Sequence, residues 1–195
     1  MAITSLDQLD LNGTYTYADY LTWQFSERLE LFKGKIALMS PAPNRQHQKI
    51  VGNLYVPFFN HFKKHTCEVY IAPFDVRLPN QGTQNDKVYT VVQPDICIIC
   101  DPEKLDDKGC IGAPDLVIEV LSPGNSRKEM RDKYSLYESA GVKEYWLVLP
   151  SEKTVIVYSL NTNGKFEGKQ PVTETETIGS DLFSGLSIEV REIFS

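Results

Sequence analysis

The sequence predicts an α/β or α+β fold, in which a mixed β-sheet is flanked by helices. Two apolar, β-branched runs at 93–99 and 113–121 read as buried strands. The segment 115–149 reads as strand, helix and strand, a unit that needs a right-handed crossover and pairs its strands in parallel. Shorter loops between the earlier strands favour antiparallel pairing, so the predicted sheet is mixed.

The N-terminal segment is expected to start as a loosely ordered stretch over residues 1–14. Thr16 is a candidate N-cap for a short helix from Tyr17 to about Gln24, because a Thr hydroxyl can accept a hydrogen bond from the first helical turn. An N-terminal hairpin is expected next, made of 28–32, a turn at Lys33-Gly34, and 35–39.

The longest expected helix runs from Arg45 to about Lys64, with Asn44 as its N-cap. Its apolar residues recur at every fourth position and indicate a core-facing stripe: Ile50, Leu54, Phe58 and Phe62. The remaining expected elements are strands at 68–78 and 88–100, an exposed connection at 101–112, a strand at 115–121, a helix capped by Asn125 or Ser126 that runs to about Ala140 with Gly141 after it, a strand at 144–149, and extra C-terminal strands between 153 and 194.

The composition predicts a globular protein in water. The 195 residues suffice for one well-buried domain, so a single domain is expected over 1–195, and a hydrophobic content of 42% is ordinary for this class. The sequence has no apolar run as long as a membrane span and no secretion signal, which predicts a cytoplasmic protein without a membrane partner. The net charge of −6 argues against a broad basic surface that coats nucleic acid, but not against a local basic groove.

The four cysteines are Cys67, Cys97, Cys100 and Cys110. Cys97 and Cys100 have the spacing of a zinc or redox pair, but residues three apart on an extended strand point to opposite faces. The sequence has no second Cys or His pair to complete a zinc set. We therefore expect buried free thiols in a reducing compartment.

Each of the two buried strands contains a carboxylate where an apolar residue is expected, and a buried charge is costly unless it is paired or binds a metal. Asp115 and Glu119 share one face of a strand but lie about 13 Å apart at ~3.3 Å per residue, so one small metal site cannot use both. Asp115 stands at the start of its strand, where it can reach solvent or cap a backbone amide. Glu119 lies deep in the strand, and with Asp95 it is the better candidate pair for a hard divalent cation.

Several segments together match the pattern of a known group of nucleases: 30–36, 39–41 with His47, 74–78, 94–96, 114–123 and 141–148. On these segments the chain resembles the PD-(D/E)XK nuclease superfamily, which has the restriction-endonuclease-like fold. More narrowly, it resembles a large bacterial family of restriction-endonuclease-like proteins that is abundant in cyanobacteria. The resemblance covers most of the chain, from about residue 15 to the end, and the long run from Gly112 to Pro150 is its most specific part.

One position departs from the superfamily pattern. A lysine usually stands two residues after the glutamate, but here that residue is Leu121. Resemblance to the narrower family implies that the lysine has moved to the following helix, where the matching residue is Lys133. The long side chain of Lys133 could bring its ammonium group back to the strand edge, and Lys128 is a weaker candidate.

The resemblance implies an endonuclease that hydrolyses DNA with Mg²⁺ or Mn²⁺ as cofactor. Asp95 and Glu119 would bind the metal, and Lys133 would orient the attacking water or stabilise developing charge. Glu30 is placed by the resemblance among the catalytic residues, and His47 is expected to make a supporting contact. A homodimer is expected, because superfamily members that cut both strands are commonly dimers.

The candidate carboxylates also have structural interpretations. Asp95 could pair with Arg77 or cap a turn, and Glu119 could be a buried carboxylate paired with Lys133. Asp75 could lie beside the site or be paired elsewhere. A basic cluster on the predicted helix could bind phosphate or form a solvated face with local ion pairs: Arg127, Lys128, Arg131 and Lys133. Four aromatic residues are expected in the core: Tyr134, Tyr137, Tyr145 and Trp146.

Two other functions stay open at this point. An inactive protein that keeps the nuclease fold could bind nucleic acid or a protein partner, and the missing lysine at position 121 supports this alternative. A metal-dependent hydrolase with a substrate other than DNA would fit the net charge of −6.

Overall fold

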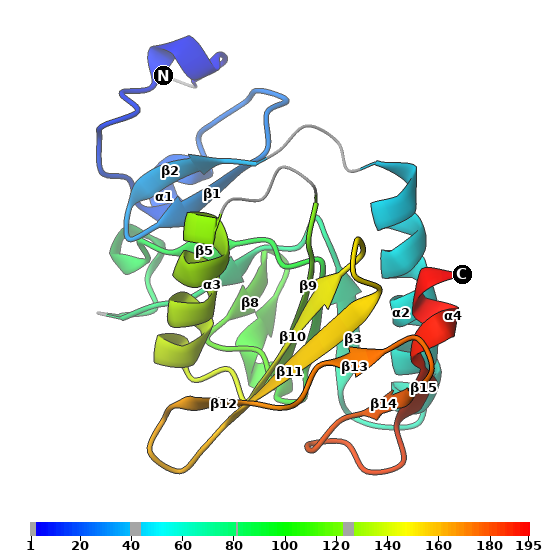
Figure 1. The fold of residues 1–195 in the computed structure, drawn as a ribbon. Coiled ribbons are helices and arrows are strands. Elements are labelled where there is room, and N and C mark those ends of the chain that lie inside the picture. The colour runs from blue at the N-terminus through cyan, green and yellow to red at the C-terminus, as the bar shows by residue number, and fades with distance from the viewer. Residues whose placement is uncertain (1–2, 40–43, 81, 123–126) are drawn as a thin grey trace.

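The computed structural model describes residues 3–39, 44–80, 82–122 and 127–195 (Figure 1). Its larger sheet has the strand order β12-β11-β10-β9-β6-β3, and β13 also pairs with β11. These strands are β3 (Glu68–Ile71), β6 (Ile96–Ile99), β9 (Leu116–Val120), β10 (Glu144–Leu149), β11 (Thr154–Leu160), β12 (Phe166–Gly168) and β13 (Val172–Thr173). The architecture is therefore a mixed α+β fold, as expected.

A second sheet has the order β2-β1-β5-β4-β8-β7 and carries the N-terminal hairpin at one edge. Its strands are β1 (Leu29–Phe32), β2 (Lys35–Leu38), β4 (Val76–Arg77), β5 (Val91–Val92), β7 (Leu105–Asp106) and β8 (Gly109–Ile111). The hairpin turn falls at Lys33 and Gly34, which both have positive φ, as the tight turns that match the twist of paired strands require. A separate hairpin near the C-terminus pairs β14 (Thr177–Gly179) with β15 (Ser187–Glu189).

Helices cover both faces of the larger sheet. α2 (Arg45–Phe62) and α4 (Val190–Phe194) pack against one face, and α3 (Arg127–Ala140) lies against the other (Figure 1). A one-turn helix, α1 (Tyr17–Tyr20), packs beside the second sheet, and three short 3-10 turns occur at Leu6–Gln8, Asn85–Lys87 and Pro102–Lys104. No helix in the described ranges has both the length and the apolar character needed to cross a bilayer.

The cap and the apolar stripe of α2 are confirmed and position its first turn. The Asn44 side chain accepts a hydrogen bond from the His47 backbone N–H at 2.9 Å. The predicted stripe is buried at all four positions: Ile50, Leu54, Phe58 and Phe62. Since the stripe packs on the sheet, His47 in the first turn is also buried, near the end of β9.

Strand register brings the two candidate metal ligands together. β9 runs parallel to β10, as the predicted crossover requires, and antiparallel to β6. Ile96 of β6 lies opposite Ile118 of β9. Asp95 directly precedes Ile96 and Glu119 directly follows Ile118, so the antiparallel register places these two carboxylates at the same level of adjacent strands.

Some predicted boundaries are wrong. Each of the long strands expected at 68–78 and 88–100 is split between the two sheets, the first around Pro73 and the second around Pro94. A proline cannot donate a ladder hydrogen bond, and here each marks the point where the chain leaves one sheet for the other. The connection expected at 101–112 contains the β7–β8 hairpin, and the first helix ends at Tyr20 rather than near Gln24.

The expectation of four free thiols is wrong for two of the cysteines. Cys67 and Cys100 form a disulfide, whereas Cys97 and Cys110 are free and buried. Glu68 lies opposite Ile99 in the β3–β6 ladder, so Cys67 and Cys100, just beyond this pair, are neighbours across the two strands. The sequence does not reveal this pairing, because it depends on which distant strands are adjacent.

The expected turn and cap at Pro123–Ser126 lie outside the described residues. The single domain over 1–195 and the loosely ordered start over 1–14 stay predictions.

Candidate active-site cleft

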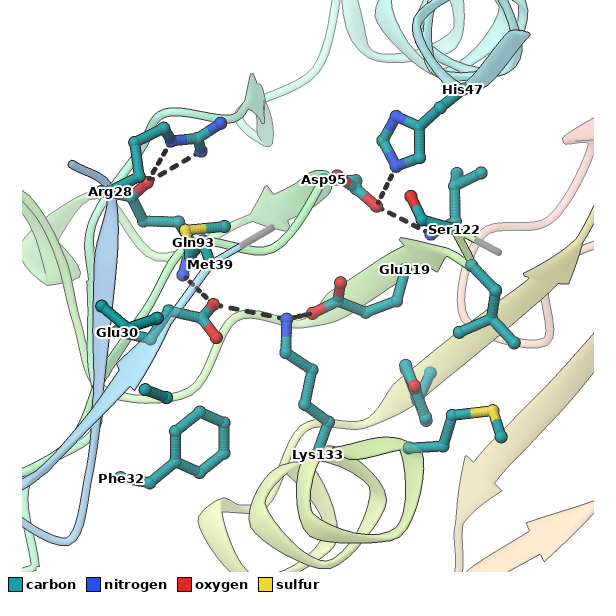
Figure 2. A pocket seen from close by; sticks show the side chains of 16 residues that line it. Arg28, Glu30, Phe32, Met39, His47, Gln93, Asp95, Glu119, Ser122 and Lys133 are labelled. Carbon is teal, nitrogen blue, oxygen red and sulfur yellow. Dashed lines mark hydrogen bonds and ion pairs between the residues drawn. The ribbon is translucent and has the colours of Figure 1, made fainter. Parts of the chain in front are cut away.

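A cleft lies where the two sheets meet, bordered by the β1–β2 hairpin, the ends of β6 and β9, α2 and α3 (Figure 2). All four predicted catalytic residues line it: Glu30, Asp95, Glu119 and Lys133. His47 also lines the cleft from the first turn of α2. The chain thus places side chains from five distant segments around one hollow.

Glu119 is a buried carboxylate of the cleft. Its Oε1 accepts hydrogen bonds from Lys133 Nζ at 2.8 Å and from the Tyr137 hydroxyl at 2.6 Å. No described residue donates to its other oxygen, Oε2. Burial raises the pKa of Glu119 to about 7, because the desolvation of the carboxylate and the charge of Asp95 outweigh the attraction of Lys133.

Lys133 lies between two carboxylates. Its Nζ is 2.8 Å from Glu119 Oε1 and 3.3 Å from Glu30 Oε1 (Figure 2). Burial alone would lower the pKa of Lys133, but the charges of these two neighbours raise it well above its usual value. The ammonium group therefore keeps its proton and bridges β9 to the N-terminal hairpin.

Asp95 is fixed from two sides through one oxygen. Its Oδ2 accepts a hydrogen bond from the Val120 backbone N–H at 2.8 Å and lies 3.2 Å from His47 Nε2. Burial alone would lower the pKa of His47, but the hydrogen bond to Asp95 and its charge outweigh burial and raise it. The alternative of an Asp95–Arg77 pair is wrong, since Arg77 pairs with Asp106.

A polar network continues from the cleft toward the second sheet. Arg28 donates from Nε and Nη2 to the Gln93 side-chain oxygen, at 3.3 and 2.8 Å. The Gln93 amide nitrogen donates to Asp75 Oδ1 at 2.8 Å, and the Tyr17 hydroxyl donates to Asp75 Oδ2 at 3.0 Å. Asp75 is therefore paired behind the cleft and does not line it.

A family model described as "Uma2: Putative restriction endonuclease" matches residues 17–191 of the chain. The chain belongs to the Uma2 family. A relative from Synechocystis, described as "Uncharacterized protein slr1290", is 31% identical over 149 residues, which cover 75% of this chain and 74% of that protein. The family expected from the sequence segments is thereby confirmed.

The fold of this Uma2 chain is also found in a solved structure. The crystal structure of "a putative nuclease belonging to DUF820" from Anabaena variabilis matches with a TM-score of 0.71 and 20% identity, covering 92% of this chain and 97% of that one. At this identity the likeness shows the fold alone.

Leu121 and Tyr145 also line the cleft, whereas the remaining charged residues singled out in the Uma2 sequence do not. Asp115 caps a backbone amide, as expected: its Oδ2 accepts a hydrogen bond from the Cys100 N–H, just after β6, at 2.8 Å, and its Oδ1 pairs with Lys143 Nζ at 2.6 Å. In the basic cluster the other three residues are exposed: Arg127, Lys128 and Arg131. Of the four aromatic residues expected in the core, three are buried: Tyr137, Tyr145 and Trp146. The fourth, Tyr134, is partly buried and packs against the core.

Sequence reasoning missed three residues that shape the cleft: Arg28, Gln93 and Tyr137. Tyr137 was assigned to the core, yet its hydroxyl binds Glu119. It stands four residues after Lys133, so both side chains project from the same face of α3, which is a signal that the sequence contains. Gln93 and Arg28 carry no comparable signal, because their contact depends on the pairing of β1 with β5.

The donor set of the cleft fits a magnesium-like cation bound through two carboxylates. Among the described residues, no three His, Cys, Asp or Glu side chains are arranged to hold a metal ion. Asp95 Oδ1 and Glu119 Oε2 nevertheless accept no hydrogen bond from any described residue, and the two residues lie opposite each other on adjacent strands. Mg²⁺ keeps several waters and is usually bound by one or two carboxylates together with substrate phosphates, so two carboxylates suffice.

Proposed function

We propose that this Uma2 protein is a metal-dependent endonuclease that hydrolyses phosphodiester bonds of DNA, with Mg²⁺ or Mn²⁺ as its cofactor. The observation that supports the proposal most directly is the convergence of Asp95, Glu119 and Lys133 in one cleft, with Lys133 Nζ 2.8 Å from Glu119 Oε1. These three residues supply the acidic and basic groups of the PD-(D/E)XK pattern, with the lysine contributed by the helix after β9.

Asp95 and Glu119 would hold the cation through the oxygens that no described residue occupies. A bound divalent cation supplies a Lewis acid that polarises the phosphate and lowers the pKa of bound water. His47 and the Val120 N–H fix Asp95 Oδ2, which leaves Oδ1 for the cation. Tyr137 fixes Glu119 Oε1 in the same way.

Lys133 would stabilise negative charge on the phosphate or orient the attacking water. Its raised pKa keeps the ammonium charged, and a charge fixed in a water-poor cleft stabilises developing negative charge more strongly than a solvated one. Glu30 accepts both from Lys133 and from the Gln93 N–H at 2.9 Å, so it anchors the lysine to the hairpin side. Lys133 would thereby have the role of the lysine that the usual pattern places two residues after the glutamate, where this chain has Leu121.

A single active site would cut one strand at a time, and two copies would let both strands be cut in one encounter. We therefore retain a homodimer as part of the proposal.

The experiment is a nuclease assay on plasmid and linear DNA with Mg²⁺ or Mn²⁺, using protein freed of contaminating nuclease. Wild type should nick or cut, while Glu119→Gln and Asp95→Asn should lose metal-dependent cleavage. Asp115→Asn is the matched control, because Asp115 lies on the same strand segment outside the cleft and an Asn there can still accept the Cys100 hydrogen bond. Cleavage that persists unchanged in Glu119→Gln would refute the assignment.

A further inference from the structure

Arg28 is a cation of the cleft that pairs with no carboxylate among the described residues. Lys133 pairs with Glu119 and Glu30, and the buried Arg77 pairs with Asp106. Arg28 lines the same cleft, yet within the described part of the chain it forms no ion pair. In a chain of net charge −6 and beside three cleft carboxylates, an arginine without a carboxylate partner requires an explanation.

The guanidinium is nevertheless oriented. Two of its N–H groups converge on the neutral Gln93 side-chain oxygen, at 3.3 and 2.8 Å. Figure 2 shows two guanidinium nitrogens directed at this oxygen, on the hairpin side of Asp95. A glutamate at position 93 would orient the arginine equally well but would cancel its charge, whereas an amide orients it and leaves the charge available.

The side-chain amide of Gln93 cannot rotate by 180° without losing the hydrogen bonds of its nitrogen. Its nitrogen donates to Asp75 Oδ1 at 2.8 Å and lies 3.3 Å from the Tyr20 hydroxyl. Exchange of the amide nitrogen and oxygen would place the oxygen against the Asp75 carboxylate and the NH₂ against the guanidinium, two repulsive contacts. Tyr17 in turn donates to Asp75 Oδ2, so the orientation of Arg28 is determined by a chain of contacts that begins in α1.

A phosphodiester is the anion that this arrangement suits. The three carboxylates Glu30, Asp95 and Glu119 make the cleft unfavourable for a polyanion unless cations offset them, and a guanidinium binds phosphate oxygens through two parallel N–H groups. We propose that Arg28 binds a backbone phosphate of the nucleic acid next to the one that is cut, and that Gln93 is the positioning residue for Arg28. This inference rests on the proposed function, which it extends by one substrate contact.

The test compares Arg28→Gln with wild type for binding to a fluorescent DNA duplex and to the matching single strand, over a series of salt concentrations. Loss of one phosphate contact should weaken binding about tenfold at low salt. It should also reduce the slope of log affinity against log salt by about 0.9 for the duplex or about 0.7 for the single strand. Arg28→Lys keeps the charge and should restore most of the slope but not all of the affinity.

Two controls separate this contact from a structural effect. Arg191→Gln removes the same charge from α4, outside the cleft, and should leave affinity and slope unchanged. Mn²⁺ affinity without DNA should be the same in Arg28→Gln and wild type, because Arg28 contacts neither candidate ligand.

A salt slope and affinity in Arg28→Gln equal to those of wild type would overturn this inference while leaving the proposed function intact. A wild-type protein that binds neither Mn²⁺ nor DNA would overturn both.

Discussion

Removal of the Lys133 charge should lower the unfolding free energy in a manner that depends on pH. The Lys133 side chain is 11% exposed, and those of Glu119 and Glu30 are 10% and 5% exposed. Lys133→Met keeps the volume but leaves two buried carboxylates without their ammonium partner. Removing one member of a buried ion pair typically costs about 3–5 kcal/mol.

The pKa of Glu119 gives the direction of the pH effect. The pKa of Glu119 is raised from 4.5 to about 7 even with Lys133 in place, so ionising Glu119 costs the folded state stability. Because the folded pKa lies above the unfolded one, this cost is absent below about pH 4.5 and complete above the folded pKa. Without Lys133 the pKa rises further, so the cost in the variant should be largest at alkaline pH and relieved by protonation in acid.

Urea unfolding at pH 8 and pH 5 measures this effect. Lys133→Met should lose about 3–5 kcal/mol at pH 8 and clearly less at pH 5, and adding Glu119→Gln should restore part of the loss at pH 8. Lys143→Met is the matched control: its partner Asp115 is buried, but the lysine side chain is 58% exposed, so the loss should be about 1 kcal/mol or less. A loss in Lys133→Met that is small, or equal at both pH values, would refute the reasoning.

Three further predictions concern the candidate metal site and the disulfide. Mn²⁺ affinity should rise as pH increases through about 7, since Glu119 must lose its proton to bind metal; calorimetry that finds constant affinity from pH 6 to pH 8 contradicts this. Tyr137→Phe removes the 2.6 Å hydrogen bond to Glu119 and should cost about 1–2 kcal/mol in urea unfolding and weaken Mn²⁺ binding several-fold; unchanged metal affinity would mean that the hydroxyl does not position the carboxylate. Reduction of the Cys67–Cys100 disulfide, whose cysteines are 33 residues apart, should lower the unfolding free energy by about 3–4 kcal/mol, with the Cys67→Ser/Cys100→Ser variant insensitive to reductant.

The fold was predictable where local patterns determine it. The every-fourth-residue stripe of α2, its Asn44 cap and the parallel β9–β10 pair could all be read from the sequence. The division of 68–78 and 88–100 between two sheets could not, because it depends on which distant strands pair. The disulfide was missed for the same reason: Cys67 and Cys100 meet only through the β3–β6 ladder.

The candidate site was predictable at its two carboxylates. A charge inside an apolar strand is anomalous in the sequence alone, which identified Asp95 and Glu119. Lys133 was found only through the family resemblance, since a lysine on an amphipathic helix is ordinary. Arg28 and Gln93 were not found, because both act through contacts between separate segments of the second sheet and neither is unusual in its local sequence.

The claim that Asp95 and Glu119 form a divalent-cation site is tested most directly by calorimetric titration of Mn²⁺ into wild type and Glu119→Gln, each with and without a DNA duplex. The predicted result is binding to wild type, alone or once the duplex supplies phosphate oxygens, and loss of that binding in the variant. Binding that is absent from wild type under both conditions, or equal in the variant, would contradict it.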